Sequence, residues 1–265
     1  MKLGTPACNP FITLNCNLRC PYCITHMHGK DTNHNYMMRG GDDWITALNN
    51  LEDVQDYIFN GGEPTLHPEF AKIINSLKSA RLVAIGTNLA HKRSFDKILA
   101  VKTRDKLVVD VSLHFGADTD KVLHRARLLA DFHVDIRIHI VKWPGWGIEA
   151  EKMIEKSRAL GLNTWELEYL GFHGGKFHAG DNAQQIRVDS CGQDATKTVN
   201  CWPTMYRPIA PNGDVYICHR LMYCQDTTGV IGNIFDGVKA ADGHVVCDKY
   251  GQCNPCDFPR RVETA

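Results

Sequence analysis

Three cysteines within the eight residues CNLRCPYC, positions 16–23, constrain this chain more than any other feature. Cys16, Cys20 and Cys23 are close enough in sequence for their thiolates to bind one metal centre, and three protein ligands leave a coordination position open. An open position is typical of a catalytic metal site, whereas four protein ligands saturate a structural one. Iron–sulfur clusters are held by cysteines at short spacings of this kind. The alternative is a structural zinc site with His26 or His28 as fourth ligand.

The same residues carry a family resemblance. CxxxCxxC with an aromatic residue before the last cysteine, here Tyr22, resembles the signature of the radical S-adenosylmethionine (SAM) superfamily. The resemblance implies a 4Fe–4S cluster held by the three cysteines, with SAM bound at its fourth iron and Tyr22 beside the cofactor. It also implies an electron donor such as flavodoxin or ferredoxin.

Short apolar runs alternate with amphipathic stretches and predict an α/β fold. Strands are expected at 11–15, 54–59, 82–87, 107–113, 134–141 and 164–170, and helices at 43–52, 67–79, 93–100, 119–132 and 148–160. This alternation implies a parallel sheet with right-handed crossovers. The resemblance makes it a partial (β/α)6 TIM-type barrel over residues 1–182, with ligands at the carboxyl ends of the strands.

Glycines follow the second expected strand in Gly61-Gly62-Glu63-Pro64. Two glycines permit a close approach of the backbone to a ligand, and Glu63 and the neighbouring carbonyls can accept hydrogen bonds from a cationic group. A plain turn is the alternative. After a CxxxCxxC loop, the four residues match the motif with which the family binds the SAM amino group.

Polar residues also end the next two strands. Asn88 resembles part of the family's TNG motif, although Leu89 stands where glycine is usual. Ser112 and His114 are two apart and so share one face of the fourth strand. The family often places a polar residue there against the SAM ribose or carboxylate, and a polar pair bonded to backbone groups is the alternative.

The fifth strand has one apolar and one polar face. Asp135, Arg137 and His139 alternate with three isoleucines, which predicts that the polar side chains face the barrel interior as a substrate chamber. Arg137 is a candidate to bind a carboxylate in bidentate fashion. Pairing of Arg137 with Asp135 is the alternative.

Cysteines are dense from Cys191 onward. Asn212-Gly213 predicts a hairpin that brings Cys218 back towards Cys201, and Cys253 and Cys256 form a later CxxC pair. The arrangement resembles the twitch domain, a shortened SPASM extension of radical SAM enzymes, and implies a second, auxiliary 4Fe–4S cluster on these four thiols within residues 183–265. A zinc ribbon on the same thiols is the alternative. Inert thiols are expected at the remaining four positions, Cys8, Cys191, Cys224 and Cys247. The alternative is that Cys224 or Cys247 replaces one of the four ligands or donates a hydrogen atom, and Cys224, six residues after Cys218, is the better placed donor.

The net charge and the hydropathy of the chain limit the cellular locations and the binding partners that we expect. Thirty basic residues balance thirty acidic ones, so net charge attracts the chain neither to nucleic acid nor to an anionic membrane. No apolar run reaches the roughly 20 residues of a membrane span, and the N-terminus lacks the apolar core of a signal peptide. We therefore expect a cytoplasmic protein whose eleven cysteines serve metal or redox chemistry rather than disulfides.

The function implied by the resemblance is reductive cleavage of SAM to a 5′-deoxyadenosyl radical that abstracts hydrogen from a substrate. A polar small molecule, such as a nucleoside, aminocyclitol or amino-acid derivative, is favoured, with oxidation or rearrangement as the outcome. A peptide maturase is the alternative, although only fifteen residues precede Cys16, too few for a leader-binding domain there. A non-catalytic zinc or iron–sulfur scaffold is an alternative of another class.

Overall fold

The computed structural model describes residues 1–23, 36–114, 116–169, 171–178, 199–201, 206–238, 245–247 and 261–263. Six parallel strands lie side by side in chain order: β1 (Ala7–Pro10), β2 (Asp56–Phe59), β3 (Leu82–Thr87), β4 (Leu107–Leu113), β5 (Asp135–Lys142) and β6 (Asn163–Glu168). The predicted α/β architecture with a mostly parallel sheet is confirmed.

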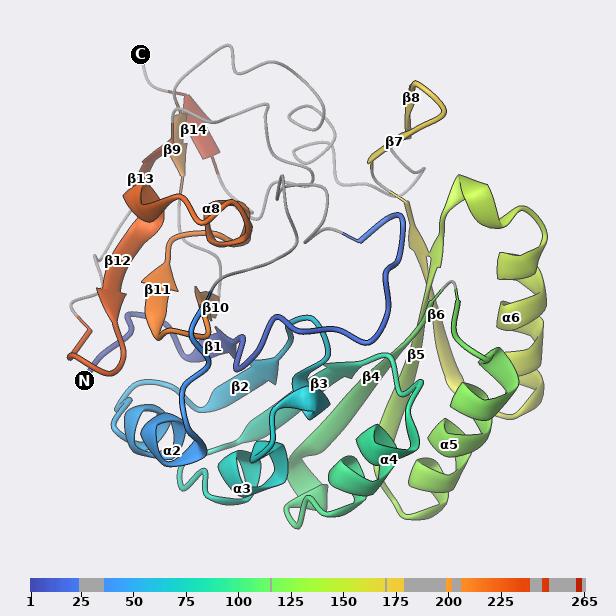
Figure 1. Ribbon diagram of the computed structural model, residues 1–265, viewed down its shortest axis with the longest axis horizontal. Coiled ribbons are helices and arrows are strands. Elements are labelled where there is room, and N and C mark those ends of the chain that lie inside the picture. The colour runs from blue at the N-terminus through green and yellow to red at the C-terminus, as the bar shows by residue number, and fades with distance from the viewer. Residues whose placement is uncertain are drawn as a thin grey trace.

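Helices cover the outer face of this sheet (Figure 1): α2 (Gly41–Asn49), α3 (Phe70–Asn75), α4 (Lys92–Leu99), α5 (Thr119–Asp131) and α6 (Glu149–Ala159). Helix α5 illustrates how sequence sets their ends and orientation. The Asp118 side chain caps it by accepting a hydrogen bond of 3.1 Å from the Lys121 amide. Val122, Ala126 and Leu129, which are four and three residues apart, are buried and turn one face of the helix to the sheet.

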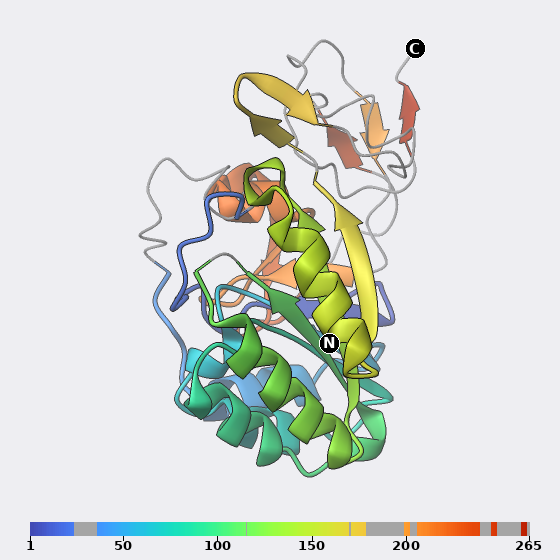
Figure 2. The same ribbon diagram turned by 90° about the vertical axis from the view of Figure 1, so that its right-hand side faces the viewer.

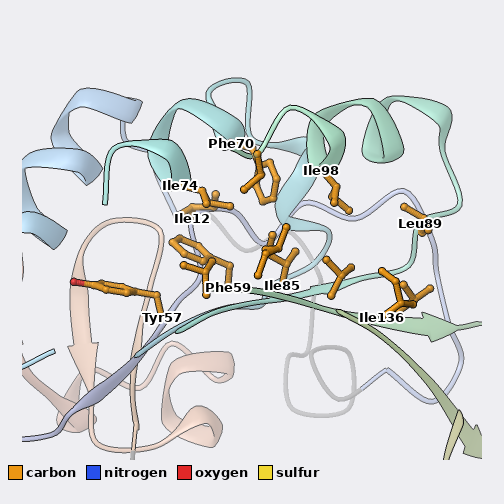
Figure 3. Packing of buried hydrophobic residues seen from close by; sticks show 14 of the residues in the cluster. Ile12, Tyr57, Phe59, Phe70, Ile74, Ile85, Leu89, Ile98 and Ile136 are labelled. Atoms are coloured by element: carbon orange, nitrogen blue, oxygen red, sulfur yellow. The ribbon is translucent and has the colours of Figure 1, made fainter. Parts of the chain in front are cut away.

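The core lies between the sheet and these helices. Phe59 and Ile85 project from β2 and β3 towards Phe70 and Ile74 of α3 and Ile98 of α4 (Figure 3). All five side chains are at most 1% exposed. Each such burial contributes about 1.5–3 kcal/mol relative to an exposed side chain, so this layer holds the strand ends at fixed positions.

The C-terminal part of the chain extends the same sheet. Strand β10 (Tyr206–Ile209) pairs in parallel with β1, and β11 (Asp214–Tyr216) and β12 (Val230–Asn233) follow in antiparallel order, which gives nine strands. The hairpin predicted from Asn212-Gly213 is confirmed as the β10–β11 connection. Helix α8 (His219–Tyr223) follows β11 and lies on the concave side of the sheet (Figure 1). The division at residue 182 into two domains stays a prediction.

Smaller elements complete the described structure. Four short 3-10 helices are η1 (Pro64–Leu66), η2 (Arg104–Lys106), η3 (Pro144–Trp146) and η4 (Thr227–Gly229). Strands β7 (Gly171–His173) and β8 (Lys176–His178) form a hairpin, and β13 (Val245–Cys247), β9 (Val199–Cys201) and β14 (Arg261–Glu263) form a three-stranded sheet. Figure 2 shows both beyond the end of β6. None of the helices in the described residues is both long and apolar enough to cross a membrane.

The first strand lies earlier than predicted. Strand β1 covers residues 7–10, and the apolar run at 11–15 forms the loop that follows it. Phe11 and Ile12 are buried in two different clusters of core residues, so their apolar character reflects tertiary packing and not a strand. Strand β1 was also missed because it ends at Pro10, and proline is rare inside sheets.

Candidate active site

A cavity of about 660 Å³ opens at the carboxyl ends of β2, β3 and β4, next to the loop that follows β1. The thiols of Cys16, Cys20 and Cys23 line it from the loop. Gly61 and Gly62 line it after β2, and Asn88 lines it after β3. Ser112 of β4 and His114 directly after that strand complete this side. The structure thus brings most of the predicted site residues to one place.

The three thiols differ in exposure but share this cavity. Cys16 is exposed, Cys23 is half-buried and Cys20 is buried. Burial, together with the neighbouring Cys23 and Cys16, raises the pKa of the Cys20 thiol to about 12. Three thiolates that line one cavity need a cationic centre to offset desolvation and mutual repulsion. This donor set fits an iron–sulfur cluster, which is bound through cysteine thiolates.

The zinc alternative requires a further ligand. His26 and His28, its candidates, lie outside the described residues. Within the described residues, the three thiols line one cavity but are not gathered around a single point that one metal ion would occupy, and this holds for either metal.

Tyr22 connects the cysteine loop to the fourth strand. Its hydroxyl and His114 Nδ1 are 3.1 Å apart and form a hydrogen bond. The Tyr22 ring also packs against Trp143 and Trp146, at centroid distances of 5.4 and 6.1 Å. Burial lowers the pKa of His114 to about 4, so this imidazole is neutral at neutral pH. Contacts of Tyr22 and His114 with the cofactor stay a prediction, and the hydrogen bond between them ties the cysteine loop to the end of β4.

The glycine turn packs against the backbone that leads to Cys16. A Cβ at Gly61 would collide with the carbonyl oxygen of Thr13, and one at Gly62 with those of Leu14 and Asn15. The Glu63 amide donates to Asn15 O at 2.7 Å and fixes the two segments together. Only glycine permits this approach, so the turn holds the cysteine loop as well as bordering the cavity.

Glu63 is buried beneath the cavity and does not line it. One carboxylate oxygen accepts from the Thr65 hydroxyl at 2.5 Å, and the other accepts from the Asn88 amide at 2.8 Å. The Thr87 hydroxyl lies 3.0 Å from both oxygens. Pro64 begins η1 and is buried too. The side chain of Glu63 therefore positions the ends of β2 and β3, and a ligand contact of its own stays a prediction.

Asn88 reaches from β3 to the cysteine loop. Its Nδ2 donates to Asn17 Oδ1 at 2.9 Å and lies 3.8 Å from Cys16 Sγ. Leu89, which follows, has a φ of 47° and a fully buried side chain. This left-handed conformation explains why glycine is usual at the position, since a Cβ there is strained.

Arg137 is not brought to the cavity. It lies further down β5, with Nη2 3.5 Å from Asp135 Oδ2, and it is not among the residues that line the cavity. The alternation on which the prediction rested is nevertheless present, because Ile136, Ile138 and Ile140 are buried while Asp135, Arg137 and His139 are not.

Among the cavity residues that sequence reasoning missed, His219 and Tyr223 of α8 come from the most distant part of the chain. The Asn9 side-chain amide lies 3.1 Å from His219 Nε2, and the Phe11 ring packs edge-on against both residues at 5.5 and 5.9 Å. No local motif marks them. They reach the cavity only because β10 pairs with β1, about two hundred residues away in the chain.

The predicted auxiliary ligands are only partly described. Cys218 is buried just before α8, and Cys201 lies on β9, while Cys253 and Cys256 lie outside the described residues, as does Cys191. Of the spare cysteines that the structure describes, Cys8 is buried in the core, Cys224 is half-buried and does not line the cavity, and Cys247 ends β13.

Comparison with known proteins decides the family. The model of the Radical SAM superfamily matches residues 11–156, which contain the cysteine loop, the glycine turn and the ends of β3 and β4. The chain belongs to the radical SAM superfamily. Membership implies SAM and an iron–sulfur cluster as cofactors, in agreement with the thiol-lined cavity.

Curated relatives share part of the chain. A stretch of 70 residues, 25% of this chain and 23% of the relative, is 39% identical to the S-adenosylmethionine-dependent nucleotide dehydratase of Selenomonas ruminantium. A stretch of 193 residues, 67% of this chain and 61% of the relative, is 26% identical to a probable GTP 3′,8-cyclase of Methanocella arvoryzae. The chain therefore spans less than two thirds of the length of either relative.

The solved structure of Streptococcus suis SuiB bound to precursor peptide SuiA shares the fold. Its TM-score is 0.62 at 13% sequence identity, and the alignment covers 89% of this chain and 64% of that one. At this identity the likeness shows the fold alone.

Proposed function

We propose that this protein is a radical SAM enzyme that abstracts a hydrogen atom from a polar small molecule, of the nucleoside, aminocyclitol or amino-acid type, and oxidises or rearranges it. The bound cluster and SAM would supply a 5′-deoxyadenosyl radical by one-electron cleavage, with the electron from a flavodoxin or ferredoxin. The single observation that carries the proposal is the convergence of Cys16, Cys20 and Cys23 with the glycine turn on one cavity.

The chain's own residues hold the reactants. Cys16, Cys20 and Cys23 would hold the cluster, and the carbonyls beside Gly61 and Gly62 would accept from the SAM amino group. Asn88, Ser112 and neutral His114 offer hydrogen bonds at the neighbouring strand ends. Tyr22 and the two tryptophans packed on it exclude water from one side, which protects a radical from quenching.

We also propose the auxiliary 4Fe–4S cluster of a twitch domain within residues 183–265, held by Cys201, Cys218, Cys253 and Cys256. Cys218 directly precedes His219, which lines the cavity. A cluster bound by Cys218 would therefore be one residue away in the chain from the wall of the cavity in which the substrate would bind. It would take up the electron left on the substrate, which favours oxidation. Cys224, the alternative hydrogen donor, does not line the cavity.

A peptide substrate is the second candidate. Its support is the fold shared with SuiB, a protein solved with a precursor peptide. The small-molecule proposal is favoured because the two curated relatives, which are more similar in sequence, are named for reactions on nucleotides.

Anaerobic reconstitution tests the proposal. Wild-type protein should carry about eight irons, from two four-iron clusters, and should form 5′-deoxyadenosine from SAM under dithionite. Replacement of Cys16, Cys20 and Cys23 by Ala should leave about half of that iron and no 5′-deoxyadenosine. Cys224→Ala is the matched control and should change neither quantity. Stoichiometric zinc without iron uptake, and no SAM cleavage, would instead support a non-catalytic scaffold.

A further inference from the structure

Below the cavity, the inner face of β4, β5 and β6 carries a second group of functional side chains. In the sheet register Asp110 is paired with Arg137, Ser112 with His139, and His139 with Trp165. Paired residues on neighbouring strands point to the same face. Asp110, Arg137, His139 and Trp165 are therefore on the face of Ser112, which lines the cavity.

The opposite face of these strands is closed by helices. Ile136, Ile138 and Ile140 of β5 are buried, and the Thr164 hydroxyl of β6 lies 2.7 Å from that of Ser157 in α6. The group on the inner face is therefore separate from the helical core and lies on the same strand face as Ser112, which lines the candidate active site.

Trp165 is an exposed aromatic surface at the end of the sheet. About half of the Trp165 residue (52%) is exposed to solvent, and its strand, β6, is the last strand of the sheet. The ring forms a T-shaped contact with the His139 ring, with a centroid distance of 6.4 Å and an interplanar angle of 60°. An indole fixed by one ring contact and half exposed is suited to stack on a planar ligand.

Asp110 and Arg137 offer an acceptor and a cation beside this ring. Asp110 Oδ1 is buried, lies 3.6 Å from His139 Nε2, too far for a hydrogen bond, and accepts none within the described structure, while 24% of the Asp110 side chain stays exposed to a ligand. The pKa of Asp110 is raised overall, mainly because the carboxyl is buried, although the neighbouring His139 and Arg137 act in the opposite direction. The Arg137 side chain is 40% exposed, and a single long contact to Asp135 leaves most of its five donors available for an anion.

We propose that this face binds a nucleotide substrate, with the base stacked on Trp165, an N–H edge of the base donating to Asp110, and the phosphates on Arg137. The inference rests on the proposed function and names the substrate class of the same site. Each element recognises a different part of one molecule: aromatic rings stack on bases, carboxylates accept from base amino groups, and arginine binds phosphate in bidentate fashion.

Anaerobic calorimetry on the reconstituted protein tests this, with GTP, guanosine and inorganic triphosphate as probes. GTP carries a base with amino and ring N–H donors and a triphosphate, and the other two probes carry one part each. Trp165→Leu should weaken GTP and guanosine about tenfold, the loss of one stacking contact, and leave triphosphate unchanged. Asp110→Asn should weaken the same two probes. Arg137→Gln should weaken GTP and triphosphate and spare guanosine.

Glu166→Gln is the matched control, because Glu166 lies on the opposite face of β6 and is paired with Arg158 at 2.7 Å. The proposal is overturned if wild-type protein does not bind GTP, or if Trp165→Leu binds it as tightly as Glu166→Gln does. Near-ultraviolet circular dichroism and iron content verify the fold of each variant. Formation of 5′-deoxyadenosine by the same samples separates the two proposals, since a wild type that cleaves SAM without binding GTP refutes only the nucleotide site.

Discussion

Leu89 allows two opposing effects to be measured at one position. Its side chain is fully buried in the core, and its φ of 47° is in the left-handed region. Truncation to Ala removes the buried side chain and keeps the strain, which should cost about 3 kcal/mol of unfolding free energy. Leu89→Gly removes the same side chain but also relieves strain of about 1 kcal/mol, so it should cost only about 2 kcal/mol.

The Gly variant should therefore be more stable than the Ala variant, the reverse of the usual order inside regular structure, where Gly is less stable by about 0.5–1 kcal/mol. Urea unfolding of wild type, Leu89→Ala and Leu89→Gly under one set of anaerobic conditions measures the difference. Truncation of Ile98, a helical core residue that is 1% exposed, to Ala and to Gly is the control for burial without backbone strain, and there Ala should be the more stable. A Leu89→Ala protein as stable as Leu89→Gly, or more so, would refute the strain argument.

Three further predictions concern the site. Gly62→Ala should displace the cysteine loop and lower both iron retention and SAM affinity. Gly40→Ala is the control and should change neither quantity, because its Cβ would meet no atom closer than 4.0 Å. Equal iron and SAM binding in the two variants would contradict this prediction. The pKa of His114 is lowered to about 4, so below the ordinary pKa of 6.5 the folded state binds fewer protons than the unfolded state. The free energy of unfolding should therefore fall by at most about 3 kcal/mol as the pH drops from about 6.5 to 4, and by less in His114→Asn. A wild-type stability that does not depend on pH in this range would be the contrary result. Turnover in deuterated water should place no solvent deuterium at the abstracted carbon, and its appearance there, lost in Cys224→Ala, would show that Cys224 is a hydrogen donor.

Local sequence patterns located the site because parallel strands end at one edge of the sheet. The cysteine loop, Gly61, Gly62, Asn88 and the pair on β4 each follow or end a strand, so a correct alternation of strands and helices was enough to bring them together. Small errors in the predicted first and last residues of the strands did not change this result. The strand ends are held by side chains buried against α3 and α4, whichever residue begins the strand pairing.

Long-range contacts and the direction of single side chains were not predictable in the same way. Glu63 was expected at the ligand, but the hydroxyls of Thr65 and Thr87 and the Asn88 amide provide donors that draw its carboxylate into the interior. That outcome depends on the spacing of two strands, which no motif encodes. His219 was missed because its position depends on the pairing of β10 with β1.

The pairing of β10 with β1 also links the two sets of thiols mechanically. Strand β1 leads directly into the loop of Cys16, and β11, joined to β10 by a tight hairpin, leads directly to Cys218. Phe11 and Tyr223 pack against each other between them, and both line the cavity. The segments that carry Cys16 and Cys218 are therefore joined through one sheet and one aromatic contact. Helix α8 acts as a wall of the candidate active site through His219 and Tyr223, and the barrel strands alone would leave that cavity open on the side of α8.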